Sequence, residues 1–310
     1  MKAYIHLLRL DKPVGTLLLL WPCWWGLALL VTHPVEWAYG YFALGALLLR
    51  SAGCIINDLW DRHIDQRVHR TKSRPLSSGA VSVPQALFVL FLLLLAGLWV
   101  LMQFPFSSIV LGLAVVPLVI AYPLAKRFFA LPQLILGLVF SWGALLAPFA
   151  AYNPDPKCLS TTCMQEMLSW PLLGQIPAFV PWLYAACVLW TLGYDTLYAL
   201  QDIKDDTRLN LRSSARTFGR WVKPMIGLCY SGMIVCLILA VDVSGWNLGY
   251  FGGLLMSTML ILLIISFLVW VIVPLDTSNP TACGNAFRAN GWLGMAIFII
   301  LFIVRPFYSL

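Results

Sequence analysis

Residues 57–65 read NDLWDRHID, an acidic stretch that follows directly on a long apolar segment. A second acidic stretch, YDTLYALQDIKDD at residues 194–206, again lies at the end of an apolar segment. The chain of 310 residues has 13 Asp and Glu residues, and seven of them lie in these two stretches. The two stretches are therefore the first candidates for a functional site.

The rest of the chain is strongly apolar, with 61% hydrophobic and 11% charged residues and a mean hydropathy of +0.85. A soluble domain of this size is far less hydrophobic. About 20 residues of helix cross a bilayer core, and the two-residue alternation of barrel strands is absent. The sequence therefore predicts an all-α integral membrane protein with a single domain over residues 1–310. Nine membrane-spanning segments are expected, near residues 14–33, 38–57, 84–103, 106–124, 132–151, 179–200, 222–242, 249–273 and 290–307.

Basic residues predict the orientation of these segments. Seventeen of the 20 Lys and Arg residues lie on one side of the predicted membrane, and Lys157 alone lies on the other. Cytoplasmic loops carry such an excess, so the N-terminus and both acidic stretches are predicted in the cytoplasm or its equivalent. The net charge of +7 is then a sign of topology and not of nucleic-acid binding.

The N-terminus resembles neither a transit peptide nor a cleaved signal sequence. This favours a bacterial inner membrane, while a mitochondrial inner membrane stays open for a chain without its presequence. Most of the eight cysteines fall in apolar segments, where buried thiols are expected. Cys158 and Cys163 lie in the predicted outer loop, and whether they pair is left open.

The first acidic stretch has the spacing of a metal site. Asn57, Asp61 and Asp65 are four residues apart, so they project from one helical face about 6 Å apart. Mg²⁺ binds one or two carboxylates together with phosphate oxygens, so these residues are candidate ligands of a Mg²⁺ that carries a substrate phosphate. Asp58 lies off this face and is expected to support the ligands. The alternative is a helix-end acidic patch paired with the basic residues Arg62, Arg67 and Arg70.

The second stretch places Asp195, Tyr198, Asp202 and Asp206 on one helical face. A row of carboxylates in a membrane helix is energetically costly, so a purely structural role does not readily explain it. Two carboxylate faces at one membrane surface can together hold two or more Mg²⁺ ions and clamp a diphosphate.

Several cations are candidates for binding an anionic substrate. Arg50 lies within the second apolar segment and shares the face of Asn57, seven residues on. A charge at that depth needs a partner, so Arg50 is predicted to bind a ligand carboxylate or diphosphate, with an internal ion pair as the alternative. Arg9 and Lys12 either face the same ligand or anchor the chain at the membrane edge. A cationic rim, for which a purely topological role stays open, comprises Arg62, Arg70, Lys72, Arg74, Tyr122, Lys126, Arg127, Lys204 and Arg212.

The acidic motifs NDxxDxxxD at 57–65 and DxxxD at 202–206 resemble the UbiA superfamily of intramembrane aromatic prenyltransferases. Further runs, spread from residue 9 to about residue 219, look like its 4-hydroxybenzoate polyprenyltransferase branch. These runs are RLDKPVG at 9–15, RSAGCIIND at 50–58, RPLSSG at 74–79, YPLAKR at 122–127, LPQ at 131–133 and YDTLYA at 194–199.

The resemblance implies nine transmembrane helices around a central cavity that opens to the lipid, with an active site at the cytoplasmic or matrix face. It implies that Mg²⁺ on an allylic diphosphate is held by Asn57, Asp61, Asp65, Asp202 and Asp206, and that Lys126 and Arg127 act on the phosphate. The implied reaction joins a polyprenyl group to the ring carbon ortho to the hydroxyl of 4-hydroxybenzoate, in ubiquinone biosynthesis. We expect Asp195 or Tyr198 to contact the phenol and accept the ring proton, and Arg50 or Arg9 to bind the carboxylate.

Two alternatives stay open. Another member of the superfamily would use a naphthoate, homogentisate, haem or glycerol-phosphate acceptor, which the run YDTLYA disfavours. A cation-coupled transporter would place its carboxylates near the bilayer midplane, in discontinuous helices. Neither the length of the isoprenoid tail nor the oligomeric state can be read from the sequence.

Overall fold

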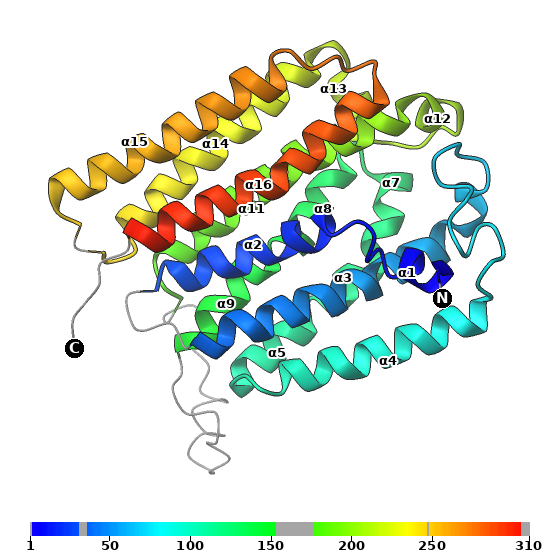
Figure 1. Ribbon diagram of the computed structural model, residues 1–310, viewed down its shortest axis with the longest axis horizontal. Coiled ribbons are helices and arrows are strands. Elements are labelled where there is room, and N and C mark those ends of the chain that lie inside the picture. Colours follow the sequence, from blue (N-terminus) through cyan, green and yellow to red (C-terminus); the bar gives the residue numbers. More distant parts are fainter. Residues whose placement is uncertain (1, 31–35, 153–175, 247, 305–310) are drawn as a thin grey trace.

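The computed structural model describes residues 2–30, 36–152, 176–246 and 248–304, and all regular structure within these ranges is helical (Figure 1). This confirms the all-α prediction. The first half contains α1 (Lys2–Leu7), α2 (Val14–Ala28), α3 (Glu36–Asp65), α4 (Val83–Leu101), α5 (Phe106–Ala114), α6 (Val116–Ala121), η1 (Tyr122–Leu124), α7 (Ala125–Phe128), α8 (Pro132–Phe140) and α9 (Trp142–Tyr152). The second half contains α11 (Phe179–Ala199), η3 (Leu200–Asp202), α12 (Ile203–Arg208), α13 (Ser214–Phe218), η4 (Gly219–Trp221), α14 (Val222–Asp242), α15 (Gly249–Phe267), η5 (Leu268–Ile272) and α16 (Pro280–Val304).

Six helical stretches of the described chain are long and apolar enough to cross a bilayer, so the protein is a multi-pass membrane protein. They are Glu36–Asp65, Val83–Leu101, Pro132–Ala150, Ser214–Asp242, Gly249–Ile272 and Pro280–Val304. Two shorter apolar helices span Val14–Ala28 and Ser108–Leu124. α11 has 21 residues but is not one of the six, and the count of nine spans stays a prediction.

The helices differ from the predicted segments at their ends and at two breaks. α3 continues past the predicted end at residue 57 to Asp65, because its polar last turns need not lie in the bilayer core. The predicted fourth segment is divided into α5 and α6 just before Pro117, which has no N–H to donate to the preceding turn. The predicted fifth segment is divided at Ser141, where no proline marks the break.

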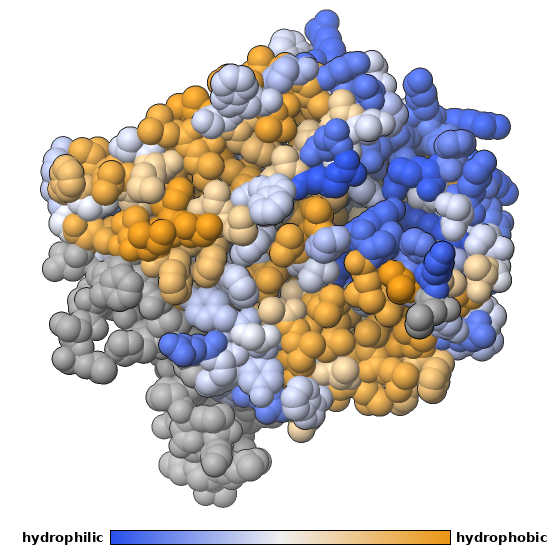
Figure 2. Space-filling model, in the orientation of Figure 1, coloured by the Kyte–Doolittle hydropathy of each residue, from blue (hydrophilic) through white to orange (hydrophobic). Residues whose placement is uncertain are grey.

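The long helices lie side by side in the order α15, α14, α11 with α16, α2, α3 and α4 (Figure 1). α11 packs against α14, α8, α16 and α9, and α2 packs against α9, α16 and α3. At one end of the bundle lie α1, the connection of residues 66–82 and α12, which we call the polar end. Figure 2 shows hydrophilic side chains gathered there, while apolar side chains cover much of the rest of this face.

A buried amide joins three of the helices. Asn290 of α16 is fully buried, and its Oδ1 accepts hydrogen bonds from Trp190 Nε1 of α11 at 2.9 Å and Tyr230 OH of α14 at 2.7 Å. Its Nδ2 donates to the Ala286 carbonyl at 3.0 Å. This one side chain therefore satisfies two buried donors from neighbouring helices.

We expect Asn290→Leu to lower the stability of the folded protein by about 2–4 kcal/mol, because it leaves both buried donors without an acceptor. Thermal unfolding in detergent, followed by tryptophan fluorescence, measures the effect. Asn285→Leu, at an exposed position of the same helix, is the matched control. Equal melting temperatures for the two variants would contradict a bracing role for Asn290.

Candidate active site

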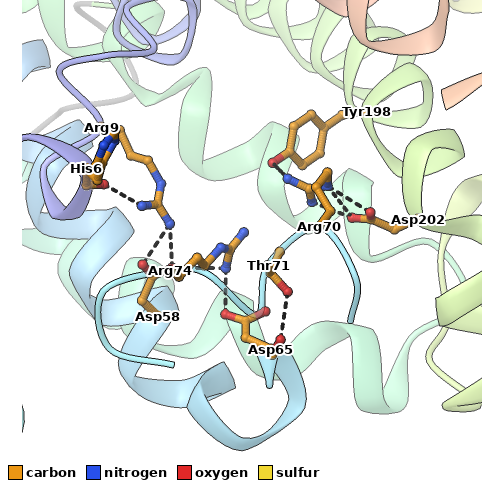
Figure 3. Close-up of polar contacts among 9 residues, drawn as sticks. All are labelled: His6, Arg9, Asp58, Asp65, Arg70, Thr71, Arg74, Tyr198 and Asp202. Carbon is orange, nitrogen blue, oxygen red and sulfur yellow. Dashed lines mark hydrogen bonds and ion pairs between the residues drawn. The ribbon is translucent and has the colours of Figure 1, made fainter. Parts of the chain in front are cut away.

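The two acidic stretches face one another at the polar end of the bundle (Figure 3). The first lies on the last turns of α3, and the second runs from α11 through η3 into α12. The 66–82 connection follows α3 and reaches across to the second stretch. Its Arg70 binds Asp202 and Tyr198, and the backbone N–H of His69 donates to Asp205 Oδ2 at 3.1 Å. Residues more than a hundred positions apart thus form one site.

On the α3 side, arginines from two segments hold the carboxylates. The side chain of Asp58 is 1% exposed and accepts hydrogen bonds from Arg9 Nη2 at 2.7 and 2.9 Å. Arg74 Nη1 donates to Asp58 Oδ1 at 3.0 Å and to Asp65 Oδ2 at 2.7 Å. The Thr71 hydroxyl donates to the Asp65 carbonyl at 3.2 Å. The 66–82 connection is therefore fastened to the end of α3 by both side-chain and backbone contacts.

Arg70 connects the two sides of the site. Its Nε donates to Asp202 Oδ1 at 2.8 Å, its Nη2 pairs with Asp202 Oδ2, and its Nη1 donates to Tyr198 OH at 2.8 Å. Its guanidinium carbon lies 4.8 Å from the centre of the Tyr198 ring. Burial alone would lower the pKa of Arg70, but Tyr198 and the Asp202 carboxylate hold the pKa above the usual arginine value. Arg70 is thus a permanent cation between the two acidic stretches.

Pairing of the acidic helix end with arginines, which the sequence left open as an alternative, does occur. The partners of the α3 carboxylates are Arg9 and Arg74. Arg70, one of the three arginines named in that alternative, pairs instead with Asp202 of the facing stretch. Arg62 Nη2, by contrast, lies 3.2 Å from Nε2 of the neighbouring His63. Four further predicted cations, Lys12, Lys72, Lys204 and Arg212, have exposed side chains.

The donor set suits a hard cation in its chemistry. Asp61 is buried at 2% exposure between the turns that carry Asn57 and Asp65, and all predicted ligands offer oxygen, which Mg²⁺ prefers. Within the described ranges, however, no group of three or more His, Cys, Asp and Glu side chains is arranged to hold a metal ion. The carboxylates of Asp65 and Asp202 instead bind guanidinium groups.

Arg50 lies within α3, and its environment differs from that of the arginines that pair with the carboxylates. Its Nε is buried without a hydrogen bond, and its guanidinium lies 5.7 Å from the centre of the Phe140 ring of α8. Among the described residues no carboxylate lies within ion-pair distance of it. The internal ion pair considered from the sequence is thus not formed within the described part of the chain.

Some predicted residues lie beyond what the structure describes. Tyr122 begins η1, and α7 follows it, but the side chains of Lys126 and Arg127 are outside the described set. Cys158 and Cys163 also fall outside it.

Sequence reasoning missed the residues that brace α11 beside Asp195. The Thr196 and Ser214 hydroxyls lie 2.6 Å apart, and the backbone N–H of Ser214 donates to Gln133 Oε1 at 2.8 Å. Thr196 and Gln133 belong to the runs YDTLYA and LPQ, so their place in those motifs was the available signal. All three are buried, which indicates a role in holding α8, α11 and α13 together.

Comparisons with known proteins agree with this site. Residues 19–299 match the model of the UbiA prenyltransferase family. The mitochondrial 4-hydroxybenzoate polyprenyltransferase of Caenorhabditis elegans is 35% identical over 99% of this chain and 83% of that protein. The 4-hydroxybenzoate geranyltransferase 2 of Lithospermum erythrorhizon is 38% identical over 99% of this chain and 92% of its own. The 4-hydroxybenzoate octaprenyltransferase of Xanthomonas campestris is 37% identical over 96% and 89%, respectively.

Solved structures share the fold. A UbiA homolog from Archaeoglobus fulgidus, bound to GPP and Mg²⁺, has a TM-score of 0.68 at 17% identity, over 97% of this chain and 99% of that one. A UbiA homolog from Aeropyrum pernix K1 has a TM-score of 0.64 at 23% identity, over 93% and 96%.

Proposed function

The chain belongs to the UbiA prenyltransferase family, and on that premise we propose that it transfers a polyprenyl group from polyprenyl diphosphate to 4-hydroxybenzoate. The new bond forms at the ring carbon ortho to the hydroxyl, the carbon–oxygen bond to diphosphate breaks, and the ring loses a proton. The products are 3-polyprenyl-4-hydroxybenzoate, a precursor in ubiquinone biosynthesis, and pyrophosphate. The observation that carries the proposal is the meeting of two acidic stretches and a basic connection at one end of an apolar bundle.

The acidic stretches form the proposed diphosphate site. Mg²⁺ would be held by Asn57, Asp61 and Asp65 from α3 and by Asp202 and Asp206 from the facing stretch, with Asp58 keeping Arg9 and Arg74 in place beside them. When bound, Mg²⁺ neutralises charge on the departing diphosphate, which is worth several kcal/mol. Arg70 and Arg74 supply further positive charge, because a guanidinium can bind phosphate through two parallel hydrogen bonds.

The cationic rim is proposed to surround that site. Tyr122 begins η1 directly after α6, and Lys126 and Arg127 lie in α7, which follows. Lys126 and Arg127 are proposed to stabilise the leaving phosphate. Exposed residues of the rim attract the anionic substrate and set the membrane orientation. These exposed residues are Lys12, Lys72, Lys204 and Arg212, and the half-buried Arg62 is proposed to act in the same way.

The acceptor site is proposed deeper in the bundle. Arg50 binds the carboxylate of 4-hydroxybenzoate, since it is a half-buried cation whose Nε is buried without a hydrogen bond and which has no ion pair among the described residues. Arg9 is less suited to this role because Asp58 already binds it at 2.7 Å. Asp195 and Tyr198, one turn apart on α11, contact the phenol and receive the ring proton. The apolar surroundings exclude water from the allylic cation.

We further propose a single domain over residues 1–310, with nine transmembrane helices around a central cavity and the N-terminus in the cytoplasm. The side of the polar end follows from its Lys and Arg content. A bacterial inner membrane is favoured, with the site facing the cytoplasm; in a mitochondrial inner membrane it would face the matrix. The transporter alternative is disfavoured, because the carboxylates lie at helix ends and α3 runs unbroken through residues 36–65.

We expect the purified protein in lipid to form 3-polyprenyl-4-hydroxybenzoate from 4-hydroxybenzoate, a polyprenyl diphosphate and Mg²⁺. A chelator should abolish the product and added Mg²⁺ should restore it, which mass analysis of the extracted lipids measures. Naphthoate and homogentisate serve as control acceptors. Release of pyrophosphate without an adduct to 4-hydroxybenzoate would show that 4-hydroxybenzoate is not the acceptor. Full activity in the presence of chelator would show that the reaction does not require Mg²⁺.

A further inference from the structure

Gly15, the second residue of α2, lies directly against the guanidinium of Arg50 on α3. A Cβ built on Gly15 would lie 2.7 Å from Arg50 Nη2 and 2.9 Å from Arg50 Cζ, and closer still to Nε. Carbon atoms do not approach other heavy atoms this closely without a shift of one group. The absence of a side chain at position 15 is therefore what makes room for the arginine head.

The backbone does not explain the glycine. Gly15 lies within an α-helix and is absent from the residues with positive φ, so any residue could adopt its conformation. Glycine also destabilises a helix relative to alanine. The space that Gly15 leaves for Arg50 is the feature that offsets this cost.

Among the described residues, the guanidinium of Arg50 is held by packing against its neighbours and not by specific bonds. The guanidinium carbon lies 5.7 Å from the centre of the Phe140 ring, and Gly15 also lies against the guanidinium. No ion pair among the described residues anchors the head, and its Nε is buried without a hydrogen bond. A displacement imposed at position 15 would thus meet no specific bond holding Arg50 in place.

We propose that Gly15 is a positioning residue that sets where the Arg50 guanidinium meets the carboxylate of the aromatic acceptor. The inference rests on the proposed function and deepens it, because it names what determines the acceptor site on the α2 side. A methyl group at position 15 turns the flexible end of Arg50 away while the fold stays intact.

The test is a double-mutant cycle in steady-state kinetics with Gly15→Ala, Arg50→Ala and the double variant. Gly15→Ala should raise KM for 4-hydroxybenzoate about 10- to 100-fold, the range for losing a charge-assisted hydrogen bond, and leave KM for the polyprenyl diphosphate unchanged. It should also reduce the preference for 4-hydroxybenzoate over its uncharged methyl ester. In the Arg50→Ala background, Gly15→Ala should have no further effect on either quantity.

Gly40→Ala is the matched control, because Gly40 lies on the same helix as Arg50 and a Cβ there would meet nothing within 4 Å. Its kinetics should equal those of the wild type. If Gly15→Ala raises both KM values alike, or acts equally with and without Arg50, Gly15 does not position Arg50. If Arg50→Ala keeps the full preference for 4-hydroxybenzoate over its methyl ester, Arg50 does not bind the acceptor carboxylate. The inference about Gly15 is then wrong as well. A wild type that forms no adduct would instead overturn the proposed function.

Discussion

Replacing Asp202 by asparagine is expected to lower the rate of prenyl transfer on the order of 10³-fold, because each tenfold loss corresponds to about 1.4 kcal/mol and metal-assisted charge neutralisation supplies several. Asparagine keeps the size of the side chain but removes the negative charge that is proposed to hold Mg²⁺ opposite α3. It also weakens the pairing with Arg70, whose Nε lies 2.8 Å from Asp202 Oδ1. The rate at saturating substrates, measured as product formed per enzyme, tests this expectation.

The control for Asp202→Asn is Asp276→Asn, a carboxylate on the exposed connection between η5 and α16 whose contacts are with Ser278. That variant should retain full activity. Unchanged turnover of Asp202→Asn in a protein that melts like the wild type would remove Asp202 from the site. Raising the Mg²⁺ concentration should partly restore the rate, because a lost ligand weakens the affinity for the metal without removing its other ligands.

Arg74→Met is expected to reduce both stability and activity, with a loss of about 3 kcal/mol in the free energy of unfolding. The side chains of Asp58 and Asp65 are 1% and 8% exposed, and Arg74 Nη1 binds both. Without Arg74, Asp65 loses its ion-pair partner and Asp58 keeps only Arg9. One of these two buried carboxylates would then be left without an ion-pair partner among the described residues.

Thermal unfolding in detergent measures the stability of Arg74→Met, and Lys72→Met is the comparison, since Lys72 is exposed on the same connection. Arg74→Lys should fall between the two, because an ammonium group keeps the charge but not the fixed planar geometry with which the guanidinium places Nη1 between the two carboxylates. Equal melting temperatures for Arg74→Met and Lys72→Met would show that the Asp58–Arg74–Asp65 contacts contribute nothing to stability.

The sequence predicted the helical membrane architecture because apolar segments of about 20 residues have a direct physical cause. Local spacing alone also placed the candidate ligands Asn57, Asp61 and Asp65 on one helical face, and their role as ligands stays a prediction. Hydropathy placed the end of the second membrane-spanning segment at residue 57 because it measures burial in the bilayer, whereas the shared face of Asn57, Asp61 and Asp65 requires the helix to continue, as α3 does to Asp65. The proline at position 117 was a visible signal for the break between α5 and α6, whereas Ser141 carried none.

The partners of the carboxylates could not be predicted, since they depend on how distant segments meet. Arg9 reaches Asp58 across 49 positions and Arg70 reaches Asp202 across 132, and no local spacing encodes such distances. Gly15 stood within the quoted run RLDKPVG, yet its closeness to Arg50 depends on the packing of α2 against α3. Residues that act through tertiary contacts are thus the part of the site that cannot be predicted from a single sequence.

The arginine bridges at Asp65 and Asp202 have a consequence for the order in which ligands arrive. A free Mg²⁺ ion must displace guanidinium groups from these carboxylates and offers them nothing in return. A Mg²⁺ that arrives with diphosphate brings anionic oxygens to which Arg70 and Arg74 can transfer. If Mg²⁺ and diphosphate bind as proposed, we expect positive coupling between them, and by thermodynamic reciprocity each then raises the affinity for the other by the same factor. Such coupling would make the resting protein selective for the loaded donor over the bare metal.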